Sequence, residues 1–283
     1  MRRREFISLL GGAAAWVSPA HAQEPQRVIG VLGSASSDTI LGGLAAFVQG
    51  LKDTGFIEGN NISIEGRWAE GQYNRLPSLA GELVSRGVAV IAAFDAPAVS
   101  AAKAATKTIP IVFMTGADPV KTGLVDSFNR PGGNLTGIFN PLSMLGSKRL
   151  ELLRELFPST STFALLVNPN NPNVADVPEI EAAANALGRR LEVLTASTES
   201  DLEAAFATMV QHRVDSLIVM ADPFLIFRRE QLVALAARHA MPAIYPIRSF
   251  ADLGGLMSYG SNVLDVNQQA GIYVGKILKG EAG

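Results

Sequence analysis

The chain has 283 residues, of which 48% are hydrophobic and 18% are charged, and its formal net charge is −2. It contains no cysteine, which excludes disulfides, a thiolate nucleophile and a cysteine that accepts lipid. The near balance of charge gives no electrostatic basis for binding nucleic acid or anionic lipid. The length is sufficient for two domains of ordinary size.

The first 22 residues have the pattern of an export signal. A basic segment, Arg2 to Arg4, precedes the short apolar stretch Ile7 to Val17 and the small-residue cleavage signal Ala20 to Ala22. The apolar stretch is too short to span a bilayer. Because Arg3 to Ile7 reads "RREFI", we favour a twin-arginine signal over an ordinary Sec signal. On either route we expect cleavage near Ala22 and a mature protein that is soluble in the periplasm.

Strands and helices alternate over the first half of the remaining chain. Short, continuously apolar runs are each followed by a segment with apolar residues at helical spacing. The predicted strands are Arg27 to Gly33, Ile62 to Arg67, Val88 to Ala93, Ile109 to Met114 and Leu135 to Phe139, and the predicted helices are 40–51, Leu76 to Ser85 and Ala98 to Thr106. This pattern is typical of a parallel sheet covered on both faces, and it predicts an α/β fold.

The same pattern begins again after a break at Asn140-Pro141 and a helix from Leu142 to Phe157. Ser200 with Glu203 predicts a capping box at one helix start, and Asp176 with Glu179 predicts a looser one. The predicted strands are Thr162 to Val167, Leu191 to Ala196, Ser216 to Met220 and Ala243 to Tyr245. We therefore predict two doubly wound, Rossmann-like lobes.

Short stretches of the two halves also resemble one another. The segments "IPIVFMTGADP", starting at Ile109, and "DSLIVMADP", starting at Asp215, both run from an apolar strand into Asp-Pro. The strand at Val28 leads into "GSASSD" as the strand at Phe163 leads into "NPNNPN". We interpret these likenesses as a pseudo-repeat.

Polar residues just past the strands are the candidate ligand contacts, because ligands of open parallel sheets bind at the carboxyl ends of the strands. Hydroxyls, amides and carboxylates suit a small polar molecule held without reaction. Asp95 or Asp222 could hold an ammonium group, and serine, asparagine and helix-end N–H groups could hold a carboxylate. The candidates are Ser34, Ser36, Asp95, Thr115, Asp118, Asn168, Asn170, Asn171, Asp222, Tyr245 and Tyr259.

Several candidates have a structural alternative. Asp118 and Asp222 each precede proline, and aspartate followed by proline is a common helix start that requires no ligand. Capping is also an alternative for the loop from Ser34 to Asp38, and the asparagine loop from Asn168 to Asn173 can be a rigid turn. Aromatic residues could line a pocket or simply pack in the core: Phe94, Phe113, Phe139, Phe224 and Tyr245.

Catalysis is not favoured by the sequence. His212 and His239 lie in predicted helices far from the strand ends, so a hydrolase triad or a histidine metal site has no basis. The dinucleotide fingerprint and the Walker loop are both absent from the sequence. We expect no enzyme activity, no cofactor and no metal, although an acid–base pair among the aspartates stays open.

Taken together, several stretches resemble the ABC transporter substrate-binding proteins of the tryptophan/tyrosine-transport type. They are "RVIGVL", "AAFVQGLKDTGFIEGNNISIEGRWAEG", "IPIVFMTGADPVKTGLVDSFNRPGGNLTG", "SKRLELLRELFP", "NPNNPN" and "GGLMSYG". The resemblance implies the type I periplasmic-binding fold, in which two lobes close on a ligand, here expected to be a small polar or aromatic amino-acid-like molecule. It also implies a monomer that delivers the ligand to an ABC permease and ATPase in the inner membrane.

On this resemblance we assign 27–140 plus about 248–283 to the N-terminal lobe and 141–247 to the C-terminal lobe. Hinges are expected near Asn140-Pro141 and between Arg248 and Gly260, with the ring of Tyr259 near the mouth. Members of the family usually continue past Gly280 through a further strand, so we expect a truncated sequence or a missing crossing. A periplasmic sensor for a receptor and a small-molecule enzyme on the same fold are the alternatives.

Overall fold

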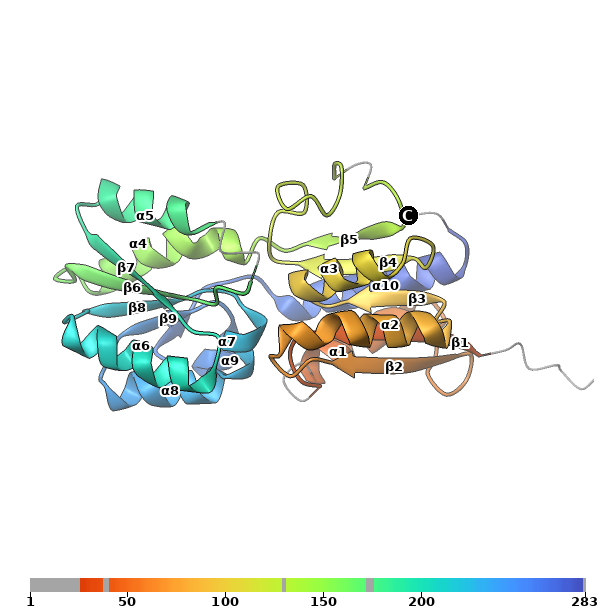
Figure 1. Cartoon of the computed structure of the whole chain (residues 1–283), viewed down its shortest axis with the longest axis horizontal. Helices are drawn as coiled ribbons and strands as arrows, with labels where there is room; N and C mark the ends of the chain where they lie inside the picture. The colour runs from red at the N-terminus through yellow and green to blue at the C-terminus, as the bar shows by residue number, and fades with distance from the viewer. Residues whose placement is uncertain (1–25, 38–40, 129–130, 172–175, 282–283) are drawn as a thin grey trace, which may run out of the picture.

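A computed structural model of the chain describes residues 26–37, 41–128, 131–171 and 176–281. The predicted export signal, Asp38 and Asn173 lie outside these residues. Two α/β lobes lie beside one another along the long axis, each with its own parallel sheet between helices (Figure 1). The predicted fold of two parallel-sheet lobes is confirmed.

The first lobe has a five-stranded parallel sheet of order β2-β1-β3-β4-β5. Its elements are β1 (Arg27–Gly33), α1 (Leu41–Asp53), β2 (Ile62–Trp68), α2 (Leu76–Arg86), β3 (Val90–Ala93), α3 (Ala96–Ala105), β4 (Ile111–Thr115), β5 (Leu135–Phe139) and, from the end of the chain, α10 (Val263–Leu278). Apolar residues of α2 and α3 pack on one face of the sheet, and those of α1 and α10 pack on the other. The strands are therefore buried on both sides, which explains their continuous apolar runs.

The second lobe has a parallel sheet of order β10-β9-β8-β6-β7. Its elements are α4 (Gly146–Leu156), β6 (Thr162–Val167), α5 (Val177–Ala186), β7 (Arg190–Thr195), α6 (Glu199–Gln211), β8 (Ser216–Val219), α7 (Pro223–Phe227), α8 (Arg229–Arg238), β9 (Ala243–Tyr245), α9 (Arg248–Asp252) and β10 (Met257–Ser258). Helices α4 and α5 cover one face, and α6 to α9 cover the other.

Both sheets have the same strand order when each is counted from its own first strand. β1 therefore corresponds to β6, as the sequence likeness after these strands suggests. The other predicted likeness is wrong in its pairing, because β8 occupies the place of β3 and not that of β4. The topological partner of Asp222 is consequently Asp95, not Asp118.

The boundary between the lobes also differs from the prediction. β10 pairs with β9 in the second sheet, and α9 packs in the core of the second lobe. The stretch 248–258 therefore belongs to the second lobe, and only α10 returns to the first. The chain crosses between the lobes at 140–142 and again at 259–262.

Two predicted helix starts are also corrected. The capping box of α6 is formed by Thr198 and Asp201, each accepting a hydrogen bond from the backbone of the other, so the helix begins before Ser200. Asp176 precedes α5, but its side chain caps no N–H group.

Helix α10 lies against α1 at very short range. A Cβ on Gly271 would lie 2.1 Å from the carbonyl oxygen of Phe47, and one on Gly50 would lie 1.9 Å from that of Gln268. Glycine at these positions lets the two backbones meet, and the apolar side chains beside them join the core of the first lobe. Within the described residues, every helix is too short or too polar to cross a membrane.

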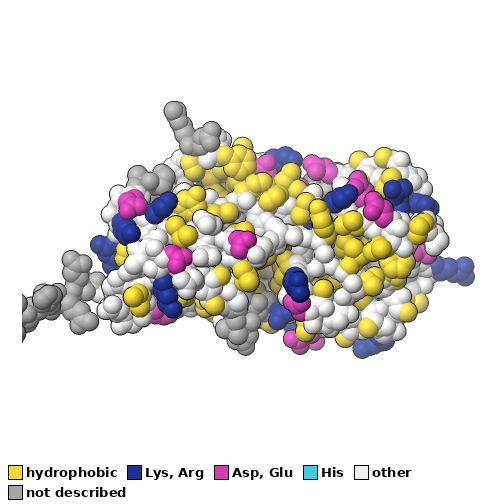
Figure 2. All heavy atoms as spheres, turned by 180° about the vertical axis from the view of Figure 1, so that it is seen from behind, with side chains coloured by type: hydrophobic (Ala, Val, Ile, Leu, Met, Phe, Trp, Pro, Cys, Tyr) yellow, Lys and Arg dark blue, Asp and Glu magenta, His cyan; other side chains and the backbone are white. Residues whose placement is uncertain are grey.

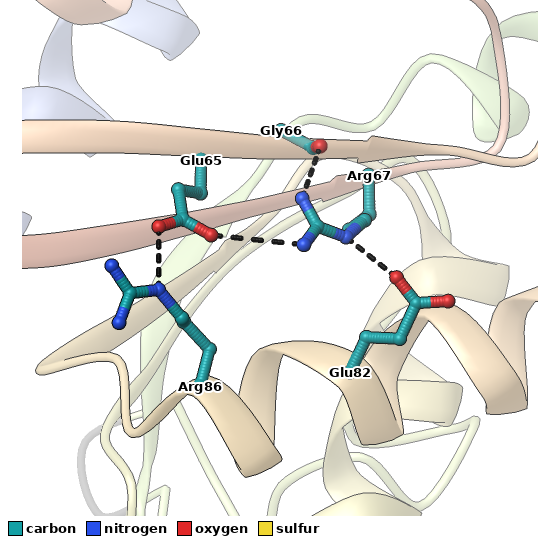
Figure 3. Close-up of polar contacts among 5 residues, drawn as sticks. All are labelled: Glu65, Gly66, Arg67, Glu82 and Arg86. Carbon is teal, nitrogen blue, oxygen red and sulfur yellow. Dashed lines mark hydrogen bonds and ion pairs between the residues drawn. The ribbon is translucent and has the colours of Figure 1, made fainter.

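The exposed edge of the first sheet carries charges in place of apolar groups. Glu65 and Arg67 of β2 form ion pairs with Arg86 and Glu82 of α2 at 2.8 Å in each case, and a 3.6 Å pair joins the two strand residues (Figure 3). Charged side chains on an edge strand oppose pairing with other chains. On the face in Figure 2, basic and acidic side chains are interspersed without a broad patch of one sign.

The close contact between α1 and α10 gives a direct stability prediction. Gly271→Ala should lower the free energy of unfolding by about 1–3 kcal/mol, because the added methyl group forces the two helices apart. Gly81→Ala in α2 is the matched control, because a Cβ there meets nothing within 4 Å; it should raise stability by up to about 1 kcal/mol. Urea denaturation of the three proteins measures both, and equal stability of both variants would contradict the packing account.

Candidate ligand-binding site

A cavity of about 770 Å³ lies between the two lobes, where the carboxyl ends of both sheets face each other. Its wall combines residues that follow the strands of each lobe with residues of the two crossing segments. They include Trp68, Phe94, Asp95 and Thr115 from the first lobe, Asp222, Ile226, Ser249 and Ser258 from the second, and Asn140, Leu142 and Ser261 from the crossings.

Asp95 stands at the end of β3 and is the N-cap of α3. Its carboxylate accepts hydrogen bonds from the backbone N–H of Ala98 at 3.0 Å and from the N–H and Oγ of Ser34 at 2.8 and 2.5 Å. Burial raises the pKa of Asp95, the bonds from Ser34 and Ala98 oppose that rise, and the negative charge of Asp222 adds to it. Asp95 thus sits at the cavity wall in a setting that favours a compensating cation.

Asp222 occupies the equivalent place in the second lobe, at the end of β8 and the start of α7. It accepts from the backbone N–H of Leu225 at 2.9 Å and from the side-chain amides of Asn168 at 3.2 Å and Asn171 at 2.5 Å. The Tyr73 hydroxyl of the first lobe donates a fourth bond at 2.7 Å. Burial raises the pKa of Asp222 despite these four bonds.

The two acids are held by equivalent hydrogen bonds in the two lobes. In each lobe, a polar residue after the first strand, Ser34 or Asn168, donates to the acid that follows the third strand. Each acid also caps the next helix, so the capping explanation holds for both. Capping does not exclude a ligand role, because both acids line the cavity.

The remaining predicted site residues are distributed between the cavity and other places. Thr115 lines the cavity with its hydroxyl bonded to the backbone of Ala117, and Ser34 lies buried behind Asp95. Ser36 is half-buried, while Asn170 is exposed beyond the amides that hold Asp222.

Three predicted residues have structural roles away from the cavity wall. Asp118 caps a turn by accepting from the N–H groups of Val120 and Lys121. Tyr245 is buried and stacks on Phe250 at 4.6 Å between ring centroids, and burial raises its pKa to about 12. Tyr259 is 39% exposed and offers its backbone carbonyl to Arg149.

Aromatic residues that sequence reasoning missed or left open form the apolar part of the wall. Trp68 ends β2 and meets Phe94 edge-on at 6.2 Å between ring centroids. Gly33 of β1 pairs with Trp68 across the sheet, and a Cβ there would lie 2.5 Å from the indole. A search for residues at the carboxyl ends of the strands could have found Trp68 if it had included aromatic residues as well as polar ones. Of the five aromatic residues considered from sequence, Phe94 is the one that lines this cavity.

Arg149 holds the two crossing segments together. It is fully buried, and it donates from Nε to the carbonyl of Tyr259 at 2.9 Å and from Nη2 to that of Leu142 at 2.8 Å. Burial lowers its pKa to about 10, so the guanidinium stays charged at neutral pH. One side chain of α4 therefore joins both connections between the lobes.

Comparison with known proteins identifies the family. The family model described as ABC transporter substrate binding protein matches residues 28–283. The chain belongs to this family. Its two lobes have the arrangement of type I periplasmic-binding proteins. Among the described residues, no group of three or more histidine, cysteine, aspartate or glutamate side chains could hold a metal ion.

Three relatives extend this result. A tyrosine-binding protein of Clostridioides difficile is 28% identical over 237 residues, which cover 83% of this chain and 68% of that protein. A structure from Streptococcus pneumoniae in complex with L-Trp is 24% identical with a TM-score of 0.80. The ligand-free, open structure of an adhesive substrate-binding protein from Clostridium difficile is 26% identical with a TM-score of 0.62. Both structural alignments cover 90% of this chain and 86% of the other.

The two lobes of this chain are in direct contact beside the cavity. At almost equal identity and coverage, the chain superposes better on the ligand-bound structure than on the open one. The bond from Tyr73 to Asp222 joins the two lobes directly. Burial and the charge of Asp222 raise the pKa of Tyr73, so the hydroxyl keeps the proton that it donates.

The buried acids predict a specific pH dependence of stability. Folding raises the pKa of Asp95 and Asp222 above the ordinary 3.8. The two protonated groups therefore contribute to the stability of the ligand-free fold below pH 3.8, and this contribution to the free energy of unfolding is lost as the pH rises through the raised pKa values. As the pH rises above 3.8, wild type should therefore lose stability relative to Asp95→Asn.

A control of opposite sign is available. Hydrogen bonds from Ser197 and Thr198 lower the pKa of Asp201, so wild type should gain stability relative to Asp201→Asn as the pH rises through the window below 3.8. Urea denaturation over both pH ranges measures the two trends. Parallel curves for wild type and Asp95→Asn would contradict the assignment.

Proposed function

We propose that this protein is the periplasmic substrate-binding component of an ABC importer, and that it binds an aromatic amino acid between its lobes. In this role the closed, loaded protein delivers the ligand to an inner-membrane permease and its ATPase. Family membership supports the transport role, and the observation that carries the ligand class is the cavity, in which an aromatic wall faces buried carboxylates.

The aromatic wall suits the side chain of such a ligand. Trp68 and Phe94 are both half-buried and already stand edge-to-face, so a third ring can pack on them in the offset or edge-on geometry that aromatic groups prefer. Leu142, Ile226 and Ile247 add apolar surface to the same cavity. The tyrosine-binding relative supports this class of ligand.

The polar part of the wall suits the backbone of an amino acid. The acids Asp95 and Asp222 present negative charge where a ligand ammonium group compensates the cost of their burial. Ser249 and Ser258 supply hydroxyls near the crossing segments for a ligand carboxylate. The proposal is of a binding protein, and it gives none of these side chains a catalytic role.

Calorimetric titration with L-tyrosine, L-tryptophan and L-phenylalanine tests the proposal. At least one should bind, and Trp68→Ala should weaken that binding by roughly 1–3 kcal/mol, because the ligand ring loses an aromatic partner. Phe128→Ala is the matched control, since Phe128 is 57% exposed and lies outside the cavity. Absence of binding for all three amino acids, or equal effects of the two variants, would contradict the proposed ligand class.

A further inference from the structure

The two acids of the cavity differ in how fully their hydrogen-bonding capacity is used. The Oδ1 atom of Asp222 accepts from Asn168 and Leu225, and its Oδ2 atom accepts from Tyr73 and Asn171. A carboxylate offers about four acceptor positions, so Asp222 is saturated. Its exposed fraction of 2% agrees with this, because almost none of its surface is open to the cavity.

The carboxylate of Asp95 accepts fewer hydrogen bonds than that of Asp222. Its Oδ1 atom accepts from the Ser34 hydroxyl and the Ala98 N–H, whereas its Oδ2 atom accepts from the Ser34 N–H alone among the described residues. Asp95 is only half-buried and lines the cavity. Of the two acids, it is the one that retains both an acceptor position and accessible surface for a ligand.

Tyr73 connects the saturated acid to the other lobe. It follows β2 of the first lobe, and its hydroxyl donates to Asp222 and accepts from the N–H of Phe224 at the start of α7. Its ring packs against the hydrophobic cores of both lobes. Separation of the lobes would break the hydrogen bond to Asp222 and remove the ring of Tyr73 from one of the two cores, and the exposure of that apolar surface to water is unfavourable.

We propose that the two acids have different tasks: Asp95 receives the ammonium group of the ligand, whereas Asp222 and Tyr73 form a latch that holds the lobes closed. The inference rests on the proposed function, because it takes the ligand to be an amino acid. An ammonium group carries three N–H donors and no acceptor, so it can use the remaining position on Asp95. Its charge also offsets the repulsion between the two carboxylates.

The first experiment separates the ammonium site from the latch by calorimetry with two ligands. L-Tyrosine and 3-(4-hydroxyphenyl)propanoate differ only by the ammonium group, and wild type should prefer L-tyrosine by roughly 10- to 100-fold. Asp95→Asn should remove most of that preference, and asparagine preserves the N-cap. Tyr73→Phe and Asp222→Asn should weaken both ligands by a similar factor and keep the preference.

The outcomes distinguish an error in the ammonium site from an error in the proposed function. A preference that survives in Asp95→Asn and disappears in Asp222→Asn would overturn the assignment of the ammonium site. Failure of wild type to bind L-tyrosine, L-tryptophan or L-phenylalanine would instead contradict the proposed function, and with it the ammonium assignment.

The second experiment tests the latch without ligand. Small-angle scattering of ligand-free Tyr73→Phe should give a larger radius of gyration than wild type, because the closed form loses its bond between the lobes. Lys121→Ala is the matched control: it removes an exposed 3.4 Å ion pair with Glu179 that also joins the lobes, and such pairs contribute little. An unchanged radius for Tyr73→Phe, or an equal increase in the control, would overturn the latch.

Discussion

The structure depends on keeping two carboxylates largely out of water where the two sheets face each other. An ionised aspartate is costly to bury unless hydrogen bonds compensate it. The fold supplies that compensation from the nearest available donors, which are the first turn of the following helix and the loop after the first strand. The helix starts, the polar loops and the contact between the lobes are therefore parts of one electrostatic arrangement.

The common strand order of the two lobes explains why the site has two related halves. Equivalent strands place Asp95 and Asp222 at equivalent points, each beside the loop that follows the first strand. The loops themselves differ, because one offers a serine and the other offers two amides. A repeated scaffold thus yields one acid that is partly accessible and one that is enclosed.

Much of the fold could be predicted from the sequence because buried parallel strands and the helices between them have clear periodicities. β1, β5 and β6 begin and end at the predicted residues. β10 was missed because two residues make no pattern, and its absence from the prediction misplaced the return to the first lobe. The selection of polar residues just past the strands found both acids and three of their hydrogen-bond donors, Ser34, Asn168 and Asn171.

The rest of the site could not be predicted because it depends on contacts between distant segments. Tyr73 lies in a short 3₁₀ turn, and its partner Asp222 is 149 residues away. Arg149 lies in a segment that resembles the family, but it donates to backbone carbonyl groups of both crossing segments. Every residue has a backbone carbonyl, so the sequence does not show which ones an arginine will contact. Tyr245 was predicted as a candidate pocket residue, but its ring packs on that of Phe250 in the core of the second lobe.

The return of α10 to the first lobe also has a consequence for how the protein acquires its structure. The second lobe is continuous in the chain, so its core can form from neighbouring segments, whereas α1 lacks its packing partner until Val263–Leu278 has been synthesised. Contacts of such large sequence separation slow folding, because the intervening chain must be ordered first. The first lobe should therefore become protected from proteases after the second lobe, although most of it leaves the ribosome earlier.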